Sequence, residues 1–236
     1  MNTKQKQVYL DDEIKNLVQV GKISCNLLHD FISPFTALDL YLDNINDKDL
    51  KKMFLPLIEN SNNIRNFIKL VQDTIEDPHA ITKFDLIEAI NTAIVLGKNK
   101  ALQNNVSVVF AKSVHNIKIK CRKLAIYQIV MNLTGNAVDA LIDKKGPRKI
   151  TISLSENQKG LRLTIKDNGS GISAVNLKKI FTKKFTTKKH GLGIGLYTIR
   201  KIVEEEWNSK IIVKSQPKIG STFHIYIPNE ILIINR

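Results

Sequence analysis

The chain has 236 residues, of which 43% are hydrophobic and 25% charged, so it can form one or two folded domains and is not disordered as a whole. It contains no apolar run near the roughly 18 residues of a membrane-spanning helix, and its polar start is unlike a signal peptide. Its two cysteines, Cys25 and Cys121, lack CxxC spacing and metal-like spacing to histidine. This argues against a disulfide framework or a structural zinc site and makes the cytosol the expected compartment.

The net charge of +14 is distributed unevenly along the chain. Residues 1–80 contain 9 Lys and Arg against 12 Asp and Glu, whereas residues 81–236 contain 27 against 10. This change indicates a domain boundary near Asp77-Pro78, with domains at residues 1–80 and 81–236. Any affinity for a polyanion is expected in the second domain.

The first domain is predicted to be an antiparallel helical hairpin. Apolar and small residues recur at alternating spacings of three and four from Ile14 to Ile45, and again from Leu50 to Ile75. The polar run Asn46–Asp49 between them predicts a short turn. Since two helices cover each other on one side only, we expect a homodimer that forms a four-helix bundle.

The second domain alternates helix and strand patterns. Helices are expected at residues 85–101 and 122–142 and in a segment that ends near 206, and strands at 106–110, 149–154, 161–166, 210–214 and 222–227. Several strands follow one another without a helix between them. This order favours an α+β fold, an α/β sandwich behind the helical hairpin, over a doubly wound parallel sheet.

A polar face is predicted on the helix at 122–142. Spacings of four place Gln128, Asn132, Asn136 and Ala140 on one side, while apolar residues such as Ile129 point elsewhere. Such a face can simply be solvated. Alternatively, an asparagine oxygen can be a neutral ligand for Mg²⁺ that is shared with nucleotide phosphates.

Two glycine-rich segments lie next to predicted secondary-structure elements. Asp167–Ile172 (DNGSGI) follows a strand, and Gly191–Leu196 (GLGIGL) precedes a helix. Backbone N–H groups at a glycine-rich helix start can bind phosphate, although a lone GxGxG is more often only a turn. No GxxxxGK[ST] motif occurs, which excludes a P-loop.

The order of these motifs resembles the ATP-binding domain of sensor histidine kinases, within the gyrase-type ATPase superfamily. Asn132–Ala137 resembles the asparagine box, and the two glycine-rich segments resemble the two glycine boxes. Ile180–Lys188 resembles the phenylalanine box of the mobile lid, with Lys183 in place of a usual proline, and Gly220–Phe223 resembles the last box.

The resemblance implies that the second domain binds ATP with Mg²⁺. Asn136 would hold the metal on the triphosphate, Asn132 would lie close by, and Asp167 would accept a hydrogen bond from the adenine amino group. Further nucleotide contacts are implied for Gly169, Gly171, Phe185, Thr187, Lys188, Gly191, Gly193, Gly195, Leu196 and Thr222. The glycines would admit the base and the phosphates, and ATP would account for the basic excess.

One position separates branches of this superfamily. Members that hydrolyse ATP with water place a glutamate base four residues before the metal asparagine, where this chain has Asn132. Because an asparagine cannot act as a base, transfer of the phosphoryl group to another acceptor fits better than hydrolysis.

His29 is the expected acceptor. It follows Leu28 of the buried stripe and precedes Asp30 and Pro34, in a run that resembles the phosphoacceptor box H-[DE]-x-x-x-P, although a lone helical histidine is usually structural. The imidazole would attack the γ-phosphoryl group, and Asp30 would orient the ring and stabilise its charge. Ser33 occupies the place where related kinases position water to dephosphorylate their partner.

We therefore predict a protein histidine kinase that phosphorylates itself on His29 and passes the phosphoryl group to an aspartate of a response regulator. A non-catalytic phosphotransfer scaffold and an ATP-binding serine kinase of the anti-sigma-factor type are the alternatives. The intact asparagine and glycine boxes oppose the first, and the matched His29 helix opposes the second. No nucleic-acid partner is expected.

Overall fold

The computed structural model describes residues 80–188 and 193–233, and the chain divides into two units between Ala80 and Ile81. The predicted hairpin at residues 1–80 and its dimer, together with His29, Asp30 and Ser33, lie outside the described residues.

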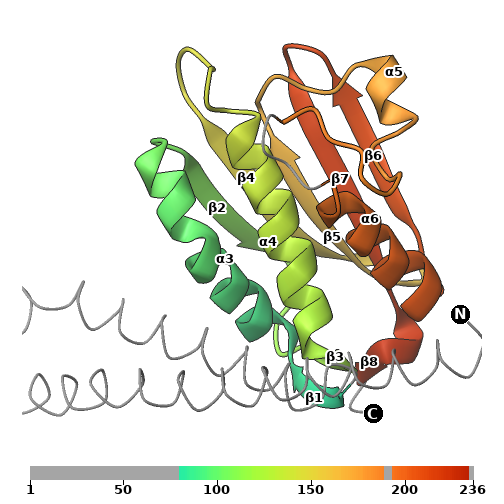
Figure 1. The fold of residues 1–236 in the computed structure, drawn as a ribbon. Coiled ribbons are helices and arrows are strands. Elements are labelled where there is room, and N and C mark those ends of the chain that lie inside the picture. Colours follow the sequence, from blue (N-terminus) through green and yellow to red (C-terminus); the bar gives the residue numbers. More distant parts are fainter. Residues whose placement is uncertain (1–79, 189–192, 234–236) are drawn as a thin grey trace, which may run out of the picture. The chain divides into compact units, whose positions relative to one another are not determined.

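A five-stranded sheet is one layer of the described part, with the strand order β2-β4-β5-β7-β6 (Figure 1). Its strands are β2 (Ser107–Lys112), β4 (Lys149–Asn157), β5 (Gly160–Asp167), β6 (Ile211–Gln216) and β7 (Gly220–Pro228). β2 is parallel to β4, and every other pair is antiparallel. The predicted strands are all present, and the α+β fold class is confirmed.

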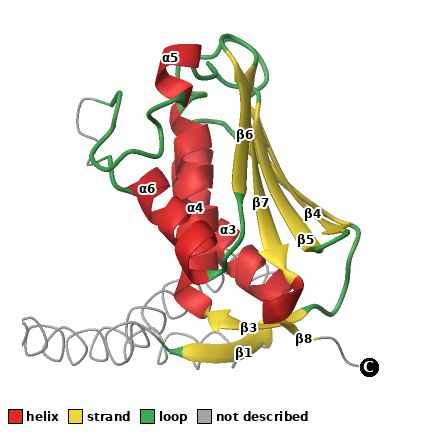
Figure 2. Ribbon diagram, turned by 90° about the vertical axis from the view of Figure 1, so that its right-hand side faces the viewer, coloured by secondary structure: helices red, strands yellow, loops and turns green. Residues whose placement is uncertain are grey.

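Helices form the second layer and cover one face of this sheet, while no described helix covers the other face (Figure 2). They are α3 (Leu86–Gln103), α4 (Lys123–Asp139), the short α5 (Ala174–Leu177) and α6 (Gly195–Arg200), which continues as a π-helical segment, η1 (Lys201–Glu206). α4 ends three residues earlier than predicted, in a series of turns.

The core lies between the two layers. Alternate residues of β4, such as Ile150 and Ile152, are fully buried towards the helices, and so is Ile165 of β5. From the other side, Ile129 and Leu133 of α4 are buried in the same layer. These residues hold α4 on the sheet, and the polar face with Asn132 and Asn136 lies to one side of this apolar contact, as predicted.

A second, three-stranded sheet was not predicted. It pairs β1 (Ile81–Asp85), β3 (Lys118–Arg122) and β8 (Leu232–Ile233), the last of which is preceded by a single 3₁₀ turn, η2 (Asn229–Ile231). These strands are short, and lysines alternate with apolar residues in β3. Their pairing partners are also far apart in the sequence, so local pattern gives a weak signal for them.

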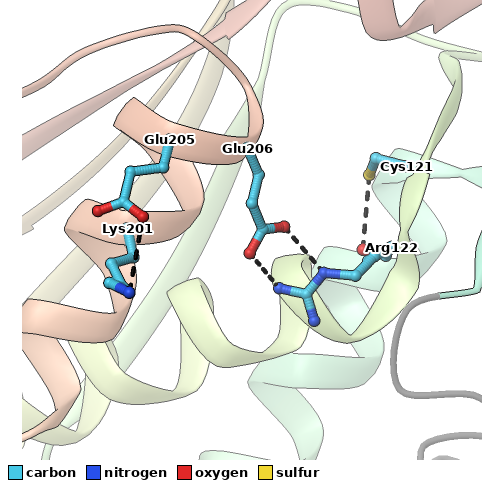
Figure 3. A network of polar contacts seen from close by, with 5 residues as sticks. All are labelled: Cys121, Arg122, Lys201, Glu205 and Glu206. Carbon is cyan, nitrogen blue, oxygen red and sulfur yellow. Dashed lines mark hydrogen bonds and ion pairs between the residues drawn. The ribbon is translucent and has the colours of Figure 1, made fainter.

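A bidentate ion pair connects the start of α4 to the end of η1 (Figure 3). Arg122 donates from Nε and Nη2 to the two carboxylate oxygens of Glu206 at 2.8 and 2.6 Å. Beside it, the thiol of Cys121 is 5% exposed and donates to the carbonyl oxygen of Arg122 at 3.5 Å. Burial raises the pKa of this thiol to about 12, an effect that the charge of Arg122 opposes and that of Glu206 reinforces.

Cys121 is therefore expected to resist alkylation in the folded chain. At about pH 8 its thiolate fraction is roughly a thousandfold smaller than that of an exposed cysteine, and the thiolate is the reactive form. We expect iodoacetamide to modify it at least roughly a hundredfold more slowly than in the guanidinium-unfolded chain, as followed by peptide mass spectrometry. Equal rates in the folded and unfolded chain would contradict this assignment.

Candidate functional site

A cavity of about 690 Å³ lies against α4, between the ends of β5 and β7 and the segment that leads into α6. Its volume is in the range of small-molecule sites. Residues from each motif predicted in the second domain line it, namely Asn132, Asn136, Asp167, Gly171, Phe185, Thr187, Lys188, Gly193, Gly195, Leu196, Ser221 and Phe223. Motifs that are up to about 90 residues apart thus meet at one site.

Asp167 lies at the end of β5, where it is 5% exposed and lines the cavity. Its Oδ1 accepts the backbone N–H groups of Gly169 at 2.8 Å and Ser221 at 3.3 Å. Burial raises the pKa of this carboxyl, although these hydrogen bonds oppose the shift. The two donors fix one oxygen, and the carboxylate supplies acceptor capacity at the wall of the cavity.

The glycines of the first glycine box are explained by close backbone packing. A Cβ on Gly169 would lie 2.5 Å from the carbonyl oxygen of Ala140, and Gly169 itself does not line the cavity. Gly171 has a φ of +68°, and its Cβ would lie 2.0 Å from the carbonyl oxygen of Gln216. Packing by itself thus requires a glycine at position 171, which also lines the cavity.

The second glycine box begins in the lid. Gly191 lies outside the described residues, whereas Gly193 has a φ of +64° and its carbonyl accepts the N–H of Lys184 at 2.9 Å. This contact joins the two ends of the segment between Lys184 and Gly193. A Cβ on Gly195 would lie 3.0 Å from the Oδ1 of Asn132, so this glycine lets the start of α6 approach α4.

A lysine ammonium group binds the side-chain oxygen of Asn136, the residue that was predicted to hold a metal. The Nζ of Lys188 donates to the Oδ1 of Asn136 at 2.6 Å and pairs with the Oδ2 of Asp139 at 2.6 Å. The other oxygen of Asp139 pairs with Lys100. Burial alone would raise the pKa of Asp139, but the hydrogen bonds and charges of both lysines lower it. The cluster places a cation where Asn136 faces the cavity.

Sequence reasoning missed Asp139, Ser221 and Phe223 as residues of the site, and it misplaced one other. Asp139 shares a helical face with Asn136, three residues earlier, which was the available signal. Ser221 and Phe223 line the cavity, whereas Thr222 does not, because β7 alternates and sends Thr222 to the other face of the sheet. The contact predicted for Thr222 is therefore corrected to its neighbour Ser221.

Among the described residues, no group of three or more His, Cys, Asp and Glu side chains could hold a metal ion by itself. Within residues 80–188 and 193–233, no helix has the length and apolarity to cross a membrane.

The motifs and fold match known proteins. Residues 121–231 match the family of histidine kinase-, DNA gyrase B-, and HSP90-like ATPases. The chain is 26% identical to the sensor histidine kinase ZraS of Escherichia coli (strain K12) over 93% of its length, and it spans 48% of ZraS. The chain is 30% identical to the catalytic domain of histidine kinase ThkA, with a TM-score of 0.56. This match covers 63% of this chain and 95% of that domain. ThkA in complex with the response regulator protein TrrA shares only the fold, with a TM-score of 0.52 at 22% identity, over 95% of this chain and 65% of that one.

The ordered motifs of residues 132–223, the cavity that they line and the match to nearly all of the ThkA catalytic domain lead to one conclusion. The chain belongs to the sensor histidine kinases, with an ATPase domain of the histidine kinase, gyrase B and HSP90 type.

Proposed function

We propose that this chain is a protein histidine kinase that transfers the γ-phosphoryl group of ATP to His29 and then to an aspartate of a response regulator. Residues 1–80 would form the dimeric phosphoacceptor hairpin, and residues 81–236 the ATP-binding domain. The observation that supports this proposal most is the convergence of Asn136, Asp167 and Lys188 on one cavity. The complex of ThkA with TrrA supports the choice of partner.

The base of the nucleotide is assigned to the Asp167 end of the cavity. Because Oδ1 is held by two backbone N–H groups, the carboxylate is fixed in orientation and can accept the adenine amino group with its remaining capacity. Ser221 supplies one of these donors from β7. A fixed acceptor in a buried site rejects bases that lack a donor at this position, since an unpaired buried carboxylate is costly.

The phosphates are assigned to the Asn136 end. The Oδ1 of Asn136 already accepts a hydrogen bond from an ammonium group, so its surroundings suit a cation, and it would be the ligand of Mg²⁺. Bound Mg²⁺ supplies charge neutralisation on the phosphates. Lys188 would then leave Asn136 and contribute its charge to the phosphates, while Asp139 keeps the ammonium close to the cavity.

The chemical steps follow from the residue types. A lone pair of the His29 imidazole forms a nitrogen–phosphorus bond, the bond from the γ-phosphorus to the bridging oxygen breaks, and ADP leaves with that electron pair. Asp30 would stabilise the positive ring and take up its proton. A carboxylate oxygen of the partner's aspartate then bonds to the phosphorus while the nitrogen–phosphorus bond breaks, and its electron pair returns to the imidazole of His29. Ser33, four residues after His29 in the sequence, would position water for the dephosphorylation of the partner.

Asn132 makes direct hydrolysis of ATP the weaker alternative. Its side chain lies beside Gly195 at the cavity and is neither an acid nor a base.

The phosphoryl transfer is tested by adding ATP labelled on its γ-phosphate to the full chain, and then a receiver domain. Label should appear first on the kinase and then on the receiver.

Replacing Lys188 with methionine is expected to weaken the binding of ADP most when Mg²⁺ is absent. Without Mg²⁺, the ammonium of Lys188 is the cation at the Asn136 end, and a charge-assisted contact corresponds to roughly a tenfold or larger change in affinity. Titration calorimetry with EDTA and with Mg²⁺ measures both constants.

Lys183→Met is the matched control, since this lid lysine lies over the ring of Tyr197, at 5.9 Å from its centroid, and does not line the cavity. Equal losses for the two variants in EDTA would show that Lys188 has no special position.

A further inference from the structure

The basic excess of the second domain is not explained by the cavity. Residues 81–236 carry 27 Lys and Arg, yet Lys188 is the only one of these among the described residues that line the cavity. The expectation that ATP accounts for this charge is therefore too simple. Much of the charge must lie where a nucleotide in the cavity does not reach it.

Part of it lies on the face of the five-stranded sheet that no described helix covers (Figure 2). Because Ile150 and Ile152 point to the helices, Lys149 and Thr151 point to the other side. Residues that pair across neighbouring strands point to the same side of the sheet. Thr151 pairs with Lys166, Lys166 with Thr222, and Thr222 with Lys214, so all four lie on this open face. Arg162 lies on this face as well, because it is two residues from Thr164 and four from Lys166 in β5 and so has the same phase.

We call Lys149, Arg162, Lys166 and Lys214 the open-face cations. They span four neighbouring strands, a width of about 15 Å at ordinary strand spacing. Lys149, Lys166 and Lys214 are exposed.

The strands of this sheet place no carboxylate on the open face. Their acidic residues are Glu156 and Asp167, and both are in phase with the residues that point to the helices. In the part of the chain that the structure describes, the ion pairs involve Lys100, Arg122, Lys188, Arg200 and Lys201, and none involves an open-face cation. The Nε of Arg162 is buried there without a hydrogen-bond partner.

His224 of β7 also lies on the open face, in phase with Thr222. Its Nδ1 is 3.0 Å from the Oγ1 of Thr164, directly opposite on β5. The pKa of His224 is lowered, first by burial and then by the charges of Arg162 and Lys214. Arg162 of β5 and Lys214 of β6 thus both act on a group in β7, the strand between them.

The cations and hydroxyl donors of this face suit a partner surface that presents many phosphate groups. Lysines alternate with the hydroxyl groups of Thr151, Thr164 and Thr222, and both groups donate hydrogen bonds to phosphate oxygens. A protein partner would meet few of the apolar and aromatic residues that form interface cores. A single nucleic-acid strand would lack stacking platforms, since the ring of Tyr226 is covered by Lys210 at 4.8 Å.

We propose that the open face binds the anionic surface of a phospholipid bilayer. The broad sheet face presents its cations together to a planar layer of headgroups, where each cation adds to the electrostatic attraction. No residue of the open face lines the nucleotide cavity, so both sites can be occupied at once.

The test is flotation of the full chain with vesicles of phosphatidylcholine alone, or of phosphatidylcholine and phosphatidylglycerol in roughly a three-to-one ratio. The open-face variant combines Lys149→Gln, Lys166→Gln and Lys214→Gln. The matched control combines Lys98→Gln, Lys178→Gln and Lys179→Gln, which removes the same charge from exposed lysines of α3 and the segment after α5.

We expect binding to the anionic vesicles only, with loss at about 0.5 M NaCl and roughly a hundredfold weaker binding by the open-face variant. The control variant should stay within about fivefold of the wild type. Thermal unfolding and ADP titration confirm that both variants are folded. Equal weakening by both variants, no binding to anionic vesicles, or binding to a single-stranded oligonucleotide in place of vesicles would each overturn the proposal.

Discussion

Replacing His29 with alanine is expected to abolish the incorporation of label from γ-labelled ATP, while the affinity for ADP changes by less than about twofold. The methyl group of alanine has no lone pair, so the bond to phosphorus cannot form. The residues that line the cavity all lie between 128 and 223, in the other proposed domain. Loss of phosphorylation with intact binding is the pattern that separates an acceptor from a ligand-binding residue.

His115→Ala is the matched control, because this exposed histidine lies in the loop between β2 and β3 and does not line the cavity. It should be labelled at the wild-type rate. Labelling of the His29 variant at that same rate would show that another residue accepts the phosphoryl group.

Replacing Asp167 with asparagine is expected to weaken nucleotide binding by roughly tenfold to a hundredfold, because a buried acceptor becomes a donor that faces the adenine amino group. Asparagine keeps an Oδ1 that can accept the N–H groups of Gly169 and Ser221, so the loop retains its hydrogen bonds. The affinity for ADP, measured by calorimetry, should therefore fall while the melting temperature changes little.

Acidification gives an independent readout for Asp167. Its pKa is raised, so as the pH falls the carboxylate is protonated, and loses acceptor capacity, at a higher pH than an ordinary aspartate. The affinity of the wild type should decline in that range, and that of Asp167→Asn should not. Asp143→Asn is a suitable control at an exposed turn. Unchanged affinity in Asp167→Asn would remove this residue from the base site.

Much of the described fold could be predicted because its elements carry strong local patterns. α4 has nearly five turns with one apolar side, and β4 and β5 alternate over most of their length. The short strands β1, β3 and β8 could not be predicted, since only residues such as Ile119 and Cys121 are buried and their pairs form across distant segments. The π-helical turn in η1 also has no local signature that distinguishes it from an α-helix.

The candidate site was predictable where the spacing of a motif determines which residues meet. It was less predictable where the phase of a strand decides which face of the sheet a side chain lies on. Asn136 and Asp167 meet at the cavity because helix and strand periods direct them there. Thr222 was assigned from its motif without the phase of β7, which places Ser221 on the helix side. The Lys100–Asp139–Lys188 cluster joins α3, α4 and the lid, and such tertiary contacts cannot be inferred from one sequence without an alignment.

The most direct test of the histidine kinase assignment is the chemistry of the phosphorylated chain. The full chain is incubated with Mg²⁺ and γ-labelled ATP, denatured, and divided between acid and base, and the labelled peptide is identified. The proposal predicts label that is lost in acid, survives base and resides on the peptide that contains His29. Label that survives acid, as on serine, or release of free phosphate without any labelled protein would contradict it.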